Sequence, residues 1–401
     1  MRRTILLAVI IFAGINILNG QPAPDYLLKA KALAETGKPE EALAILSAEI
    51  QKGAGANALI MRAEIFLAAG NTGMAEKDYN AAVSSLPGQS NYGLARVYAI
   101  RREAAKSVKY LMESLRYENS KNEKDIMLEK AFTAIENTPE WRQFWQNYSF
   151  PEEDARLSEV EYYLSTGKVK EAQKISGEMA GKYPESDKSL YARALVDFSL
   201  QKYQDVLTSL QSILKKESRN SEYLYLQAKA QMASGNAAGA SVTYTRLIET
   251  GIVDATPYLR RAECYYKTGE FQKALTDINK YLDFYQSSKE AVRMAGKVSI
   301  ALGDNIKAIS YFTRNIELNP WDASCYIDRA GAYFSARSWS LASDDYGMSL
   351  DLDPGNADAW LNKGIAVVNT GMTGDACYYF NRAFILGNRQ ASSWINRYCI
   401  K

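Results

Sequence analysis

The apolar positions of this chain recur with a fixed period of 34 residues. Within residues 323–356, Tyr326, Ala330 and Tyr333 stand at helical spacing, and a second set around Tyr346 repeats that spacing further along. Spacings of three and four residues between apolar positions predict amphipathic helices, here two short helices joined by a turn. Because a fixed period of a few tens of residues is typical of repeat architectures, the pattern predicts a repeated helical hairpin.

Ten repeats of this pattern share one register. Position 8 is Ala or Gly in nine of the ten, position 20 is Ala in eight, and position 24 is a large apolar residue in nine. The repeats start near Ala23, Ala56 and Gly88 and then, without insertion, at Glu153, Asp187, Ser221, Ala255, Lys289, Ala323 and Ala357. Two antiparallel helices approach closely where side chains are small, and large residues beside the contact fill the grooves. The shared register therefore predicts tightly packed helical hairpins.

Turn residues complete the pattern. Seven repeats, including those with Gly235 and Gly303, carry Gly at position 15, and four, including those with Pro320 and Pro354, carry Pro at position 32. Glycine adopts the left-handed conformation that ends a helix, and proline stops the next one. The period and these residues resemble the tetratricopeptide repeat (TPR) family of helix-turn-helix solenoids. The resemblance implies an all-α fold, a right-handed superhelical solenoid of helix-turn-helix hairpins.

The same resemblance implies a concave groove lined by positions 2, 5, 9, 12 and 13 of the first helices. Mapped onto this sequence, the lining combines aromatic and basic residues, a mixture that suits a peptide or protein segment. We expect the binding groove to include Tyr191, Phe198, Tyr225, Lys229, Tyr266, Lys267, Arg293, Lys297 and Phe334. Ordinary packing or surface exposure is the competing explanation for each of these residues. The Lys and Asn pair with which one TPR subfamily holds a terminal carboxylate is absent from these repeats.

Five segments are expected along the chain. They are a signal peptide at 1–20, three TPR-like repeats at 23–118, a degenerate aromatic-rich hairpin at 119–152, seven contiguous repeats at 153–390 and a short capping helix at 391–401. In the degenerate hairpin, Trp141, Phe144 and Trp145 stand near positions where tight packing favours small residues. These aromatic residues are expected either to fill a local core or to form a partner-binding patch.

The N-terminus carries the features of an export signal. Arg2 and Arg3 precede an apolar run of 14 residues, 5–18, which is shorter than the roughly 20 residues that a membrane span requires. A basic start followed by a short apolar stretch and small residues is typical of a secretory signal. A retained N-terminal anchor is the alternative. We therefore expect export to the periplasm or another part of the cell envelope.

Composition excludes several classes of function. The chain has 48 basic and 46 acidic residues, with no histidine and no clustered Lys or Arg that would predict nucleic-acid binding. No catalytic, phosphate-binding or metal-ligand motif occurs, so we expect neither enzymatic activity, nor a cofactor, a metal or a small-molecule substrate. Cys264 and Cys325 fall among apolar residues of first helices and are expected to be buried. Cys377 and Cys399 are a candidate disulfide pair in an exported chain.

These expectations favour an exported TPR scaffold or adaptor that mediates protein–protein interactions in a bacterial cell envelope. Its partner would be a protein or peptide, and membrane association would arise through that partner or an uncleaved signal. A periplasmic holdase-type chaperone and a glycan- or cell-wall-binding accessory protein are the alternatives. The C-terminal end around Trp394 and Tyr398 competes with the groove as the binding site.

Overall fold

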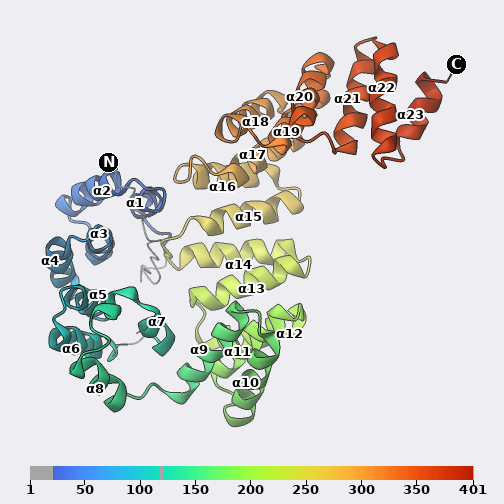
Figure 1. Ribbon diagram of the computed structural model, residues 1–401. Coiled ribbons are helices and arrows are strands. Elements are labelled where there is room, and N and C mark those ends of the chain that lie inside the picture. The colour runs from blue at the N-terminus through green and yellow to red at the C-terminus, as the bar shows by residue number, and fades with distance from the viewer. Residues whose placement is uncertain (1–20, 118–120, 401) are drawn as a thin grey trace. The chain divides into compact units, whose positions relative to one another are not determined.

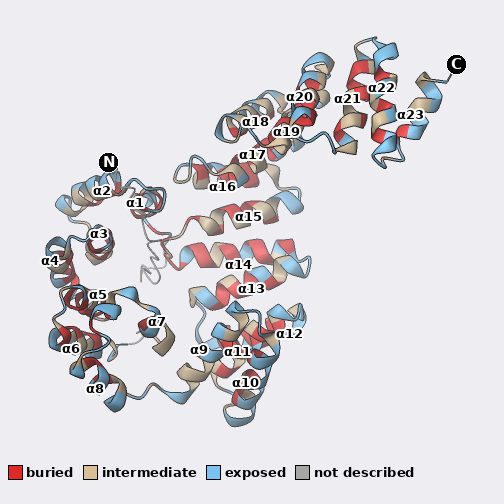
Figure 2. Ribbon diagram, viewed as in Figure 1, coloured by how far each residue is buried: buried red, intermediate tan, exposed pale blue. Residues whose placement is uncertain are grey.

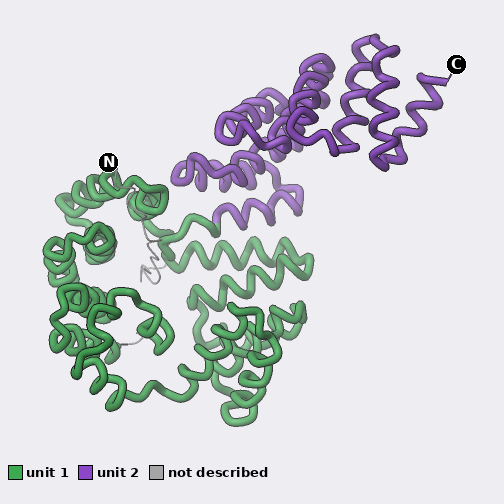
Figure 3. The backbone as a smooth tube through the Cα atoms, in the orientation of Figure 1, with its two compact units in different colours: residues 1–257 green, residues 258–401 purple. Residues whose placement is uncertain are grey.

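The computed structural model describes residues 21–117 and 121–400, and all regular structure in these ranges is helical (Figure 1). The expected all-α class is therefore confirmed, and consecutive helices pack against each other as hairpins. The chain divides into two compact units, residues 1–257 (unit 1) and residues 258–401 (unit 2), which Figure 3 colours separately. The expected signal peptide at 1–20 lies outside the described residues.

The helices of unit 1 include eight that precede the uninterrupted run of repeats. These are α1 (Asp25–Glu35), α2 (Pro39–Gln51), α3 (Ala56–Ala68), α4 (Thr72–Ala82), α5 (Pro87–Ile100), α6 (Ala104–Ser114), α7 (Glu123–Leu128) and α8 (Pro139–Asn147), with a 3-10 helix η1 at Lys130–Ala134. The unit continues with α9 (Glu152–Ser165), α10 (Val169–Lys182), α11 (Asp187–Ser199), α12 (Tyr203–Lys216), α13 (Ser221–Ala233) and α14 (Ala237–Glu249).

Unit 2 continues the same alternation of first and second helices. It contains most of α15 (Thr256–Lys267), then α16 (Phe271–Leu282), α17 (Lys289–Ala301), α18 (Asn305–Leu318), α19 (Ala323–Ser335), α20 (Trp339–Leu352), α21 (Ala357–Asn369), α22 (Thr373–Ile385) and α23 (Ala391–Tyr398). The first helices α11, α13, α17, α19 and α21 begin at the first residue of their 34-residue repeats. No described helix combines the length and the apolar character that crossing a membrane requires.

Several first helices end in a residue with left-handed backbone conformation at position 15. Gly235 and Gly303 adopt φ of 84° and 78°, which glycine tolerates because it has no Cβ. Three repeats lack glycine there, and Arg102, Gln201 and Arg337 nevertheless adopt φ of 62°, 59° and 58°. For residues with a Cβ this conformation costs about 1–2 kcal/mol. Closure of the hairpin therefore imposes the turn geometry even where the residue disfavours it.

The close contact between the two helices of a hairpin involves positions 8, 20 and 24, which are buried in every repeat (Figure 2). Where position 24 is phenylalanine, position 8 is glycine. A Cβ added to Gly296 would lie 2.4 Å from the Phe312 ring, and one added to Gly364 would lie 2.5 Å from the Phe380 ring. Because interiors are close-packed, the small residue and the large ring require each other.

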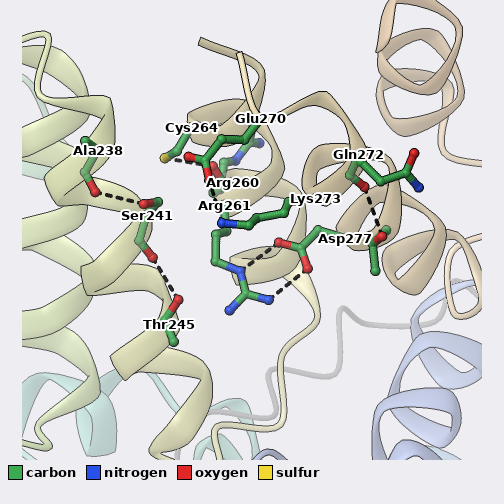
Figure 4. A network of polar contacts seen from close by, with 11 residues as sticks. Ala238, Ser241, Thr245, Arg260, Arg261, Cys264, Glu270, Gln272, Lys273 and Asp277 are labelled. Atoms are coloured by element: carbon green, nitrogen blue, oxygen red, sulfur yellow. Dashed lines mark hydrogen bonds and ion pairs between the residues drawn. The ribbon is translucent and has the colours of Figure 1, made fainter. Parts of the chain in front are cut away.

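An ion pair between a partly buried arginine and a buried aspartate joins the two helices of three hairpins, always between positions 7 and 23. The pairs are Arg62–Asp78, Arg261–Asp277 and Arg329–Asp345, and both guanidinium contacts of each pair measure 2.7–2.8 Å. Figure 4 shows the two parallel hydrogen bonds from Arg261 on α15 to Asp277 on α16. Bidentate geometry of this kind is strong and directional. The pair therefore holds the register between the helices, and its signal in the sequence is Arg followed by Asp 16 residues later.

The segment between the third hairpin and α9 is built of α7, η1 and α8. Trp141 and Phe144 on α8 are buried, and their rings stack against each other with centroids 5.6 Å apart. The Phe132 ring lies 4.9 Å from that of Trp141, and Trp145 packs against the same cluster. The aromatic residues thus fill a local core, the first of the two roles expected for them.

A largely buried ionic network attaches this segment to the preceding hairpins. Arg96 on α5 contacts Glu64 on α3 at 2.7 Å, and its Nε lies 3.0 Å from a carboxylate oxygen of Glu129, between α7 and η1. The Tyr79 hydroxyl on α4 donates a hydrogen bond of 2.7 Å to the same Glu64. Arg96 therefore bridges two carboxylates far apart in the sequence and joins the residue before η1 to α3 and α5.

The cysteines fall into two classes. Cys377 on α22 and Cys399 after α23 form a disulfide with a Cα–Cα distance of 5.6 Å, which ties the last helix to the last hairpin. Cys264 and Cys325 lie outside this disulfide and are fully buried, as their apolar neighbours predicted. Burial raises the pKa of the Cys264 thiol to about 12, so it stays protonated and unreactive.

Candidate functional site

The nine residues predicted to line the groove divide between the two units. Unit 1 carries Tyr191, Phe198, Tyr225 and Lys229, and unit 2 carries Tyr266, Lys267, Arg293, Lys297 and Phe334. All nine lie on first helices, because they were assigned from first-helix positions. Each unit therefore forms its own candidate surface.

In unit 1, three of the four residues come together. The Lys229 ammonium on α13 lies 5.0 Å from the centre of the Phe198 ring on α11 and 5.7 Å from that of Tyr225. A cation above aromatic faces is held electrostatically, by roughly 0.5–1 kcal/mol at an exposed site. Tyr191 behaves differently, since it is 8% exposed and packs on the Tyr223 ring at 4.8 Å. The Tyr191 side chain packs between α11 and α13, and too little of its surface is exposed for it to contact a partner.

Helix α7 lies on the inner side of unit 1, facing α9 (Figure 1). The Lys124 ammonium on α7 lies 3.1 Å from the Glu161 carboxylate on α9, and Glu161 occupies position 9, one of the implied groove positions. Partial desolvation raises the pKa of Glu222, and the nearby carboxylates of Glu161 and Asp125 raise it further. Part of the inner face of unit 1 is thus occupied by the chain's own α7.

In unit 2, the structure forms a pocket of about 540 Å³ between α15 and α17. Its lining residues are Tyr266, Lys289, Glu290, Arg293, Met294 and Lys297. Tyr266 stands at position 12 of one repeat, whereas the other five stand at positions 1, 2, 5, 6 and 9 of the next. Three of the predicted residues, Tyr266, Arg293 and Lys297, therefore meet at one site.

The charged groups of this pocket differ in how far they are already paired. The Lys289 ammonium pairs with Asp322, and the Arg293 guanidinium lies 2.5 Å from the Asp328 carboxylate. The Glu290 carboxylate lies 2.7 Å from Arg260.

Lys297 is exposed and has no ion pair with any residue that the structure describes. With Met294 and the exposed Tyr266 beside it, the pocket offers apolar contact area and one uncompensated positive charge. Such a surface can receive an apolar side chain and an adjacent carboxylate.

The two remaining predicted residues do not line the pocket. Lys267 is exposed near the end of α15, and Phe334 on α19 packs edge-on against Trp339 with ring centroids 4.8 Å apart. Sequence reasoning missed Lys289, Glu290 and Met294, although Glu290 occupies position 2, one of the positions that the resemblance marks. Met294 stands at position 6, for which the pattern carried no signal. Among the described residues, no group of three or more Cys, Asp or Glu side chains could hold a metal ion.

Family comparisons agree with this architecture. Residues 27–90 and residues 258–288 each match a model described as tetratricopeptide repeat. Residues 157–245 match the model of the coatomer epsilon subunit. A comparison with curated proteins finds no match to this sequence.

Solved structures show the same likeness. The C-terminal part of a TPR repeat-containing protein from Cytophaga hutchinsonii superposes with a TM-score of 0.52 at 17% identity, covering 59% of this chain and 98% of that one. A tetratricopeptide repeat protein from Parabacteroides merdae gives a TM-score of 0.46 at 18% identity, covering 61% and 97%. YrrB, described as a TPR protein with an unusual peptide-binding site, gives 0.40 at 17% identity, covering 47% and 97%. At these identities the likeness concerns the fold alone.

Sequence and structure lead to one assignment. The 34-residue period, the buried small and large positions of each hairpin and the two matched segments all describe the same repeat. The chain carries tetratricopeptide repeats, which family models match at residues 27–90 and 258–288.

Proposed function

We propose that this protein is an exported TPR scaffold or adaptor of a bacterial cell envelope, and that it holds a peptide or protein segment in its groove. TPR solenoids generally present extended surfaces to protein partners. The observation that carries the proposal is the pocket of unit 2, where two successive repeats place Tyr266, Met294 and Lys297 on one surface. Aromatic and thioether side chains supply adaptable apolar contact, and a lysine orients an acidic group.

The ion pairs of the pocket support this role. Arg293 is held by Asp328 and Lys289 by Asp322, so their side chains are ordered before a partner arrives. Ordered side chains lose less conformational entropy on binding. Lys297 would then supply the charge that a carboxylate of the partner neutralises. The proposal includes no catalytic step, cofactor or nucleic-acid partner.

Two observations support export. Residues 1–20 have the composition of a secretory signal, and the Cys377–Cys399 disulfide is of a kind that persists in oxidising compartments. Fractionation of cells that produce the full chain, with N-terminal sequencing of the product, tests this part. Recovery of the intact, uncleaved chain from the cytosol with all four cysteines reduced would contradict it.

The groove is tested by affinity capture from the native envelope, followed by mass spectrometry. The variant combines Tyr266→Ala with Lys297→Glu. Lys307→Glu on α18 is the matched control, because Lys307 is also an exposed lysine but lies outside the pocket. We expect the wild type and the control to capture the same one or few folded partners. The pocket variant should capture at most about a tenth of the amount of each partner that the wild type captures, as expected when a central contact is lost.

Other outcomes separate the alternatives. Equal capture by all three proteins would move the binding site away from the pocket. Capture of many unfolded chains by the wild type would favour a holdase-type chaperone instead of a scaffold. Binding of purified peptidoglycan that is lost in the pocket variant would favour a cell-wall-binding accessory protein. Circular dichroism of each variant shows whether the helical fold is retained.

A further inference from the structure

Helix α22, the second helix of the last complete hairpin, carries exposed apolar residues in addition to its buried ones. Its inner face packs Ala376, Phe380 and Ala383 into the core. On its outer face Tyr378 and Ile385 are 59% and 72% exposed, with Phe384, half exposed, beside them. Polar Asp375 and Asn381 are exposed on the same helix, so the apolar residues form only part of its solvent-facing surface. The outer face of α22 therefore combines polar residues with three large apolar side chains that are at least half exposed.

The exposed apolar surface extends beyond the helix itself. Met372 at the N-cap, Leu386 at the C-cap and Ile400 after α23 are also exposed. Single exposed apolar residues are ordinary, but a group of this kind on one element indicates an interaction surface.

The charges around α22 are mostly positive. Residues 371–400 contain Arg382, Arg389 and Arg397 but a single carboxylate, Asp375, in the first turn of the helix. Elsewhere the chain is close to balanced, with 48 basic and 46 acidic residues in all. The Arg382 guanidinium lies 5.7 Å from the centre of the Trp360 ring, so a cation and an aromatic ring stand together beside the exposed face. This end of unit 2 therefore combines positive charge with uncovered apolar area.

We propose that the outer face of α22, together with Arg389 and Arg397, docks on an anionic lipid surface. Interfacial helices bind in this way, with the apolar face among the acyl chains and the cations at the headgroups. Tyrosine and tryptophan suit the boundary because one end of the ring system is apolar and the other polar. A second copy of the chain fits less well, since a symmetric contact between two such faces brings arginines against arginines.

The disulfide gives this surface a defined shape. Cys377 lies on α22 and Cys399 directly precedes Ile400, so the bond keeps the end of α23 beside α22. Arg397 and Ile400 consequently belong to the same end of the molecule as Tyr378 and Ile385. The surface lies on other elements than the α15–α17 pocket, and the inference does not depend on the function proposed for that pocket.

The test is co-sedimentation of the full chain with vesicles of phosphatidylglycerol and phosphatidylcholine in equal parts, and with vesicles of phosphatidylcholine alone. The variant combines Phe384→Glu with Ile385→Glu. Ile306→Glu on α18 is the matched control, because Ile306 is 84% exposed in the same unit. All variants carry the same N-terminal residues, so any lipid affinity of that segment is common to them.

We expect preferential binding to the anionic vesicles, unchanged in the control and about tenfold weaker or more in the α22 variant. Arg389→Glu with Arg397→Glu should weaken binding by about fivefold per arginine. Equal vesicle binding by the wild type and the α22 variant, or no preference for anionic vesicles, would overturn the proposal. A second result would also overturn the proposal. In it, the wild type does not bind vesicles but sediments as a dimer without lipid, and the α22 substitutions abolish that dimer. Circular dichroism verifies the fold of each variant.

Discussion

Replacing Gly296 with alanine tests the packing rule of the hairpins most directly. Gly296 lies in the middle of α17 and faces Phe312 on α18. An added Cβ would lie 2.4, 2.5 and 2.9 Å from Cε1, Cζ and Cδ1 of that ring, well inside van der Waals contact. Phe312 is fully buried, so the ring has no open space into which it can move.

Two opposing effects determine the result. Alanine is favoured over glycine in a helix interior by about 1 kcal/mol. Overpacking of a core costs about 1–3 kcal/mol, and contacts below 3 Å to three ring atoms place this site at the upper end of that range. We therefore expect Gly296→Ala to lower the free energy of unfolding by about 1–2 kcal/mol.

Urea denaturation followed by far-ultraviolet circular dichroism measures this change. Gly331→Ala on α19 is the control, because no atom lies within 4 Å of its added Cβ and the helix effect acts alone. The control should be stabilised by up to about 1 kcal/mol. In the Phe312→Leu background, Gly296→Ala should cease to be destabilising. Equal stabilisation of the two single alanine variants would refute the packing argument.

Three further predictions follow from the fold. Arg337→Gly should stabilise the protein by about 0.5–1 kcal/mol, because glycine removes the cost of the left-handed conformation at the end of α19, and urea denaturation measures it. Asp277→Ala should destabilise it by about 3 kcal/mol, since Arg261 loses its buried carboxylate partner, whereas an unchanged melting temperature would contradict the structural role of the pair. Reduction of the Cys377–Cys399 disulfide should lower the local stability of α22 and α23 by about 3 kcal/mol. Hydrogen exchange should then become faster in these two helices and stay unchanged in the others.

The period of the sequence was sufficient to predict the helices and their hairpins. Each repeat has to bury one face of two helices, and that requirement places small residues at positions 8 and 20 and a large one at position 24. The constraint is local, because both helices of a hairpin lie within 34 residues. Burial of Cys264 and Cys325 follows from the same register. Cys377 and Cys399 were the candidate disulfide pair because both lie near the C-terminal end, and the structure confirms the pairing.

Which side chains form a site was decided only by the tertiary structure. Tyr191 and Tyr266 were both assigned to the groove, yet Tyr191 is buried against Tyr223 while Tyr266 lines a pocket. The ion pair of Arg293 with Asp328 connects neighbouring repeats, and among the described residues Lys297 is the pocket cation without an ion pair. Repeat position indicates the direction of a side chain, whereas exposure and charge depend on the particular residues that neighbouring repeats place opposite it. The sequence by itself therefore determined the architecture, and contacts between repeats determined which part of the surface is available to a partner.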